Sequence, residues 1–106
     1  MSSFAEHTTK SRRLAALRLI VESGGSANES VIHQALTGML GFPLTSREDL
    51  RDDLAWLKER RLLLVDSLPI EGDRVLMVVK VTQDGVDAAA GRGKPIEGLA
   101  RPLIAG

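Results

Sequence analysis

Hydrophobic and polar positions alternate with helical spacing through the first half of the chain. Apolar residues recur three or four positions apart behind three short segments, residues 3–6, 26–29 and 45–48. Each segment starts with serine or threonine and ends in glutamate three residues later. This is the signature of a helix N-terminus, because the side-chain oxygen satisfies a free helix N–H and the acid returns the bond. The pattern predicts that three helices begin at these segments.

The apolar positions that follow predict how far each helix extends. The first helix covers residues 4–23 and stops at the glycine pair 24–25. The second is short and amphipathic, and its apolar face reaches Leu40, with Gly41 behind it. The third reaches Arg61 and is exposed on most of its circumference, because its apolar positions form one narrow stripe. That stripe consists of Leu50, Leu54 and Leu57.

The second half of the chain changes to a strand-like pattern. Two runs rich in leucine and β-branched residues, 62–68 and 74–81, predict strands. The segment 69–73 between them contains a proline and a glycine, which favour a turn, so the two runs form a predicted β-hairpin. Thr82 then caps a last short helix over residues 83–90.

The order of these elements predicts the fold. Three helices, a hairpin and a terminal helix, in the order α-α-α-β-β-α, are typical of a winged helix-turn-helix, which is mainly α with a small β-hairpin wing. Residues 41–45 form the turn between the second and third helices. A chain of 106 residues with 43% hydrophobic content is expected to build one core. We therefore predict one domain over residues 1–91 and a mobile tail over residues 92–106, where glycine and proline break the regular pattern.

Three motifs carry a resemblance to a known family. Leu-Thr-Ser-Arg at residues 44–47 leads into Asp-Leu-Ala-Trp-Leu at residues 53–57, and Thr-Gln-Asp-Gly at residues 82–85 enters the last helix. The sequence thereby resembles small winged-helix proteins of Mu-like phages and prophages. More distantly it is similar to metal-sensing ArsR-like and MarR-like bacterial repressors, which dimerise through terminal helices and place the third helix in the major groove. The resemblance implies a homodimer in the cytoplasm of the bacterial host.

The predicted fold implies duplex DNA as the partner, and a phage or prophage transcriptional regulator or accessory factor as the function. Residues near the start of the third helix would meet base edges, while the wing would meet the adjacent backbone. Basic residues on the first helix would add phosphate contacts. The candidate DNA-binding residues are Thr45, Ser46, Arg47, Arg51, Arg74, Lys10, Arg12 and Arg13.

The charge pattern opposes this interpretation. Fourteen basic residues balance fourteen acidic ones, so no net charge draws the chain to nucleic acid. Residues 47–54 contain two arginines against four acids, and two further acids flank the glycine of the wing turn. A structural explanation of the helix acids is equally available, since Glu48 is placed to close a capping box and early acids complement the helix dipole.

Trp56 supports an alternative function. It is the only tryptophan and lies about 100° from the leucine stripe of the third helix. It is either an anchor for a dimer or protein partner, together with the acidic third helix, or a residue packed beneath the first helix or the hairpin. The alternative function is a protein–protein interaction module on a winged-helix scaffold.

Other kinds of chemistry are not expected from this sequence. The chain has no cysteine, and Glu29 and His33 lie one helical turn apart without a second histidine nearby, so we expect no metal site. No serine sits in a nucleophile elbow and no phosphate loop joins a strand to a helix, so we expect neither an enzyme nor a cofactor. No apolar run reaches the roughly 20 residues of a membrane span, and the polar N-terminus does not resemble a signal peptide.

Overall fold

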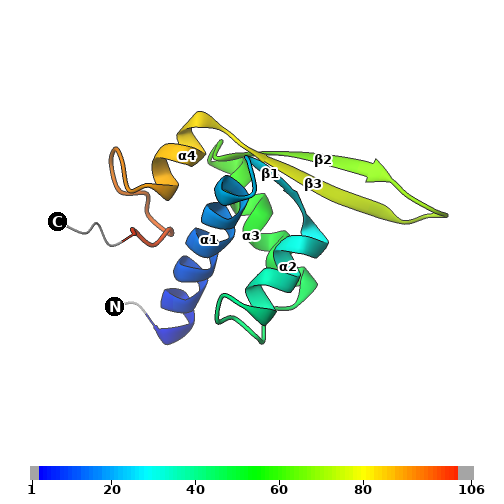
Figure 1. The fold of residues 1–106 in the computed structure, drawn as a ribbon. Coiled ribbons are helices and arrows are strands. Elements are labelled where there is room, and N and C mark those ends of the chain that lie inside the picture. The colour runs from blue at the N-terminus through cyan, green and yellow to red at the C-terminus, as the bar shows by residue number, and fades with distance from the viewer. Residues whose placement is uncertain (1–2, 103–106) are drawn as a thin grey trace.

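The computed structural model describes residues 3–102, which form four helices and one three-stranded antiparallel sheet (Figure 1). The sheet has the strand order β1-β3-β2, so the third strand in sequence lies in the middle. The elements are α1 (Phe4–Glu22), β1 (Ser26–Asn28), α2 (Glu29–Gly38), α3 (Arg47–Glu59), β2 (Leu63–Pro69), β3 (Val75–Val81) and α4 (Gln83–Ala89).

One hydrophobic core joins the helices to the sheet. The leucine stripe predicted for the third helix is confirmed, because all three of its leucines are fully buried on α3. Leu17 and Ile20 of α1 and Ile32 of α2 pack into the same cluster, and Val79 reaches it from the central strand. At about 25 cal/mol per Å² of buried apolar area, such a cluster is the main stabilising term of a domain of this size.

The N-terminus of α1 follows the sequence prediction closely. The hydroxyl of Ser3 accepts a hydrogen bond from the backbone N–H of Glu6 at 3.1 Å, as a capping serine does. The helix ends at Glu22, and Gly24 and Gly25 follow with positive φ, which lets the chain reverse direction.

The start of the second helix corrects the prediction. Residues 26–28 form strand β1, and the helix is capped by Asn28, whose side chain accepts from the backbone N–H of Val31 at 2.9 Å. Ser26 is instead a strand residue opposite Lys80 of β3. The predicted order α-α-α-β-β-α is therefore incomplete, since a short strand lies between α1 and α2. The expected apolar face is also too long, because α2 ends at Gly38 and Leu40 is exposed.

The N-terminus of α3 corrects the prediction by one position. Ser46 is the capping residue, and its hydroxyl accepts from the backbone N–H of Asp49 while the carboxylate of Asp49 accepts from the backbone N–H of Ser46. Asp49, and not Glu48, closes the capping box, because the returning acid must lie three residues after the cap. The hydrogen bond from the backbone N–H of Ser46 is the main reason that the pKa of Asp49 is lowered.

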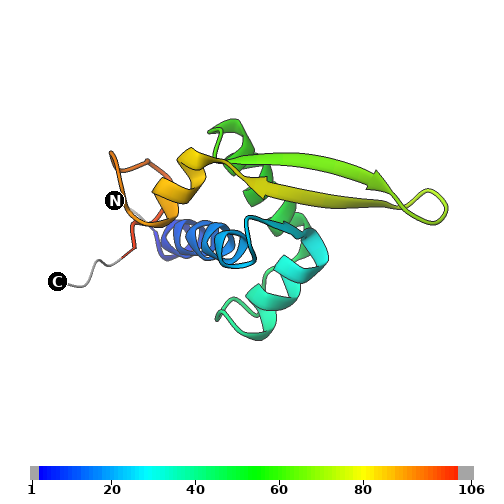
Figure 2. The same ribbon diagram turned by 45° about the horizontal axis from the view of Figure 1, so that its top comes forward.

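The hairpin projects beyond the helices (Figures 1 and 2). Its register runs from Leu63 opposite Val81 to Pro69 opposite Val75, so both predicted strands are confirmed to within one residue at each end. Strand β1 pairs only with residues 78–80 of β3, which leaves the outer half of the hairpin two-stranded.

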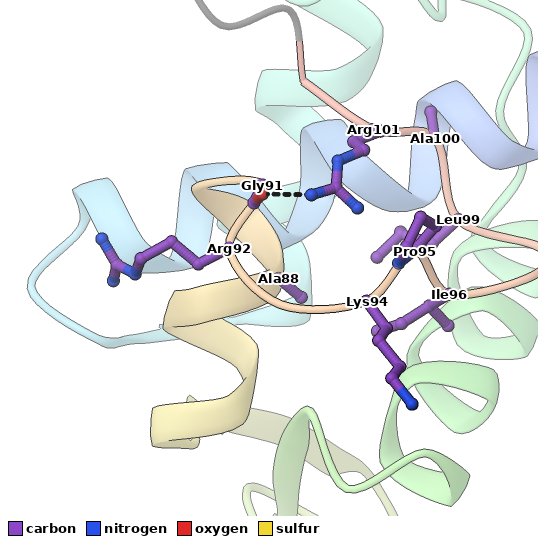
Figure 3. Close-up of a pocket in the computed structure, with 9 residues that line it drawn as sticks. All are labelled: Ala88, Gly91, Arg92, Lys94, Pro95, Ile96, Leu99, Ala100 and Arg101. Carbon is purple, nitrogen blue, oxygen red and sulfur yellow. Dashed lines mark hydrogen bonds between the residues drawn. The ribbon is translucent and has the colours of Figure 1, made fainter.

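The described part of the tail lies against α1. The backbone N–H of Ala100 donates to the carbonyl of Lys10, and Arg13 donates to the carbonyl of Gly98 at 3.0 Å. Figure 3 shows Arg101 reaching back to the carbonyl of Gly91, at 2.7 Å. Residues 92–102 therefore make specific contacts with the folded part of the chain, while the division after Gly91 stays a prediction. Within residues 3–102 no helix is long and apolar enough to cross a membrane.

Candidate nucleic-acid interface

Two arginines at the start of α3 converge on one buried acid of α2. Arg51 donates from Nε and Nη2 to the two carboxylate oxygens of Glu29, at 2.9 and 3.0 Å. Arg47 donates from Nη2 to the hydroxyl of Ser30 at 2.9 Å, and its Nη1 lies 3.9 Å from the Glu29 carboxylate. The Glu29 side chain is 3% exposed, whereas Arg47 and Arg51 are 45% and 55% exposed. The carboxylate of Glu29 is therefore buried, whereas about half of each arginine side chain is exposed.

The fold places Glu29 at the start of α2. It is the first residue of α2 after the Asn28 cap, and a carboxylate in the first helical turn interacts favourably with the helix dipole. The pKa of Glu29 is lowered, chiefly by the hydrogen bonds from Arg51 and further by the nearby charges, although burial acts in the opposite direction. The carboxylate is thus held ionised beneath the two arginines.

The exposed half of α3 separates its charges into two stripes. At about 100° per residue, Arg47, Arg51 and Lys58 fall within about 40° of one another. The acidic stripe lies about 100° further round the helix. It consists of Glu48, Asp52 and Glu59. Residues 47–54 are therefore net acidic as a segment, but the basic residues of α3 lie together on one side of the helix.

A recess of about 200 Å³ separates α3 from the hairpin next to this basic stripe. Its lining comes from both elements and from the start of α2. The lining residues are Glu29, Arg51, Ser67, Val75 and Met77. Arg51 therefore lies beside the hairpin.

The two candidate arginines of α1 point elsewhere. Arg12 donates from Nε and Nη2 to both carboxylate oxygens of Asp53, the second of these at 3.2 Å, and Arg13 lies 3.4 Å from the same carboxylate. Asp53 is buried, and both arginine side chains are largely covered. These cations join α1 to α3 and are spatially separate from the pair at Glu29. Lys10 is half-buried one turn away on α1.

The remaining candidate residues fall into two groups. Thr45 is buried, and its hydroxyl donates to the carbonyl of Phe42 at 2.9 Å, while Ser46 is occupied by the cap of α3. Both side chains therefore have structural partners. Arg74 is exposed at the end of the hairpin turn, next to β3. The structure thus brings the side chains of Arg47 and Arg51 together at Glu29. Thr45 and Ser46, although next to Arg47 in the chain, are engaged in structural hydrogen bonds.

The chain itself covers much of Trp56. The guanidinium carbons of Arg13 and Arg60 lie 4.1 and 3.8 Å from the ring centroid, one from α1 and one from the end of α3. Gly98 of the tail approaches the ring so closely that a methyl group there would clash with it. The ring packs against the core and is half-buried. Its packing involves α1 and the tail.

Sequence reasoning missed the two buried acids that organise these arginines. The sequence pattern presents Glu29 as the acid of a capping segment and as a weak metal pair with His33, but Nε2 of His33 lies 2.8 Å from the carbonyl oxygen of Thr45. Asp53 enters the sequence analysis only as one of the four acids of residues 47–54 and as the first residue of the motif at residues 53–57. A signal for Asp53 was present, because it lies only about 40° from Leu57 on the helical wheel. Among residues 3–102 no group of three acidic or histidine side chains is arranged to hold a metal.

A second surface feature lies between the start of α1 and the connection from α2 to α3. Phe4 and Leu44 are 87% and 94% exposed, although both are large and apolar. They flank a groove of about 330 Å³. The groove is lined by Phe4, Thr8, Arg12, Gly41, Phe42, Pro43, Leu44 and Thr45. Apolar side chains with this exposure are uncommon on an isolated domain when they gather at one groove.

Comparison with known proteins identifies a phage family. The chain is 35% identical over 94 residues to uncharacterized protein gp26 of Escherichia phage Mu, an alignment that covers 89% of this chain and 90% of gp26. It is 40% identical over 81 residues to an uncharacterized protein of Haemophilus influenzae, which covers 76% of this chain and 74% of that protein. The chain belongs to the family of phage Mu gp26, so the expected relation to Mu-like phages is confirmed. No profile of a known protein family matches the chain, and no solved structure matches it.

Proposed function

We propose that the chain is a winged helix-turn-helix protein of Mu-like phages that binds duplex DNA. Helix α3 follows α2 after a short connection, and the hairpin that comes next projects beside it (Figures 1 and 2). In winged-helix proteins the second helix of such a pair enters the major groove, and the hairpin reaches the neighbouring backbone. A transcriptional regulator or a packaging-related accessory factor, acting as a homodimer in the host cytoplasm, suits this arrangement.

The observation that carries the proposal is the arginine pair on buried Glu29. Arg47 and Arg51 emerge half-exposed from the N-terminal turns of α3, where a recognition helix contacts base edges. Lys58 continues the same stripe. If Arg47 and Lys58 meet phosphates, log affinity should fall with log salt at a slope of about −2 for each bound protomer. The proposal does not use Arg12 and Arg13, because both are held by Asp53.

Fluorescence anisotropy tests the proposal. Pooled duplex fragments of the genome that encodes the protein are titrated at two salt concentrations, with wild type and with the double variant Arg47→Ala, Arg51→Ala. We expect wild type to bind the duplex fragments at low salt and its affinity to fall as the salt concentration rises. The double variant should bind at least about tenfold more weakly than wild type. The control is Arg18→Ala with Lys94→Ala, which removes two exposed charges outside α3. If the two double variants bind DNA with equal affinity, α3 is not the helix that contacts DNA.

A second candidate function is protein interaction, which the groove between Phe4 and Leu44 favours. Projecting apolar side chains and an apolar groove on one surface suit an isologous contact, in which each copy inserts a side chain into the groove of the other. Leu44→Asp should then abolish a dimer in light scattering, whereas a dimer that survives would exclude this groove. Trp56 and the acidic stripe of α3 stay an alternative partner surface, tested by co-purification with Trp56→Ala.

A further inference from the structure

We propose that Glu29 positions Arg51 to recognise a guanine in the major groove, which rests on the proposed DNA binding. Arginine contacts guanine with two parallel N–H groups that meet O6 and N7, and this is the most common base-specific contact in protein–DNA complexes. The contact requires a guanidinium that is exposed, correctly oriented and free along one edge. Arg51 is 55% exposed, Glu29 holds its orientation, and one edge of its guanidinium stays free.

The hydrogen bonds of Arg51 leave one edge of its guanidinium free. A guanidinium has five N–H groups in a fixed plane. Glu29 takes one from Nε and one from Nη2, at 2.9 and 3.0 Å, which occupies a single edge of the fork. The two N–H groups of Nη1 and the second of Nη2 remain. The end formed by Nη1 and Nη2 can therefore still donate two parallel hydrogen bonds.

Glu29 also holds this edge in a fixed direction. Its carboxylate is 3% exposed at the first turn of α2, so it cannot follow a mobile side chain outward. A bidentate contact with such an acid restricts the rotation of the arginine before DNA arrives. Part of the side-chain entropy that binding removes is then already lost in the free protein. Preorganisation of this kind favours a directional contact with a base over a loose contact with phosphate.

The charges around the two arginines favour a base contact for Arg51 and a phosphate contact for Arg47. The carboxylate of Glu29 offsets the charge of Arg51, which weakens its attraction to phosphate but leaves its hydrogen-bond geometry intact. Arg47 is held by the neutral hydroxyl of Ser30 and lies 3.9 Å from the acid, so its charge is less compensated. Arg47 is therefore the phosphate contact of the pair and Arg51 the base contact.

Selection from a randomised duplex pool tests the proposal, using wild type, Arg51→Lys and Glu29→Gln. Wild type should enrich a guanine at one fixed position, and replacing that guanine should weaken binding about tenfold. Arg51→Lys keeps the charge and should keep the salt slope but lose the guanine. Glu29→Gln should bind the unselected pool more tightly while its preference for guanine falls. Glu48→Gln removes an equivalent charge from the acidic stripe, so it should raise pool affinity without changing the base preference.

The outcomes separate the inference from the proposed function. Failure of wild type to retain any duplex at low salt would overturn DNA binding and the inference with it. Retention without an enriched guanine, or an Arg51→Lys variant that selects the same guanine, would overturn only the inference. Circular dichroism establishes that each variant is folded. If Glu29→Gln does not fold, Glu29→Asp, which keeps the charge but draws the carboxylate back, replaces it. An unchanged preference for guanine in either variant would overturn the positioning role of Glu29.

Discussion

Asp53 of α3 accepts two hydrogen bonds from Arg12 of α1, across 41 positions of sequence. Their side chains are 2% and 14% exposed, so the pair is shielded from water. The hydrogen bond with Asp53 is the main reason that the pKa of Arg12 is raised. This contact fastens the first helix to the third and explains why a basic face on α1 is not a free surface for phosphate.

Replacement of Asp53 by alanine should destabilise the protein strongly. Arg12 and Arg13 would lose their acid while remaining largely covered, and breaking a buried pair in this way costs about 3 to 5 kcal/mol. Chemical denaturation measures the loss. Asp52→Ala is the matched control, because Asp52 is the exposed neighbour on the same helix and its loss should change stability by less than about 0.5 kcal/mol. Equal losses in the two variants would contradict the internal role of Asp53.

Gly98→Ala should detach the tail from Trp56. Gly98 has φ +92°, and an added methyl group would lie 2.5 Å from Cζ2 of the ring. Gly93→Ala is the control, since Gly93 has φ +81° but no atom within 4 Å of the added methyl group. Both variants carry the backbone cost of about 1 kcal/mol, and Gly98→Ala should lose about 1 to 3 kcal/mol more. Only Gly98→Ala should shift the emission of Trp56 to the red, as the ring meets more water.

Gly85→Ala should be destabilising although alanine is the better helix former. An added methyl group would lie 2.2 Å from the carbonyl oxygen of Leu62 and 2.6 Å from a methyl carbon of Val81, so α4 would have to move from the sheet. We expect a loss of about 2 kcal/mol in thermal unfolding. Gly38→Ala at the end of α2 meets nothing within 4 Å and should instead stabilise by about 0.5 kcal/mol. The test is whether the free energy of unfolding falls in Gly85→Ala and rises in Gly38→Ala.

Acid should weaken the protein in part through Glu29. The pKa of Glu29 in the folded state is lowered from its ordinary value of 4.5, chiefly by Arg51. Folding therefore favours the ionised form, and the resulting stability is present above pH 4.5 and lost as pH falls through the folded pKa. Denaturation in urea at a series of pH values from neutral to acid should show a shallower decline for Glu29→Gln than for wild type. Parallel declines would show that the contact with Arg51 contributes nothing to acid sensitivity.

The helices and the hairpin were predictable because each is determined by neighbouring residues. The stripe of Leu50, Leu54 and Leu57 has helical spacing and is buried as expected. Strand β1 was missed for the opposite reason. Three residues have no measurable periodicity, and they form a strand because Ala27 lies opposite Val79, more than fifty positions later in sequence. Ser26 satisfies the sequence rule for a helix cap, but pairing with β3 decides its conformation.

The candidate site was predictable only as a set of residue types. Sequence reasoning named Arg47 and Arg51 among eight candidates, and because they are four positions apart they lie on one face of α3. It also grouped Arg12 with them, because the local sequence around an arginine does not indicate which acid will be its ion-pair partner. The partner acids lie 22 positions before Arg51 and 41 positions after Arg12, distances at which local patterns carry no information.

By itself the sequence determined where the helices and the hairpin lie, because capping, helical spacing and turn residues act over three or four positions. It also determined that the leucine stripe of α3 belongs to the apolar core. Only the tertiary structure decided which charges are free. Burial of Glu29 and Asp53 fixes an ion pair at each, and packing of α1 against α3 turns Arg12 inward while the start of α3 leaves Arg51 half in water. The physical reason is that an ion pair depends on distance in space, which the local pattern does not encode.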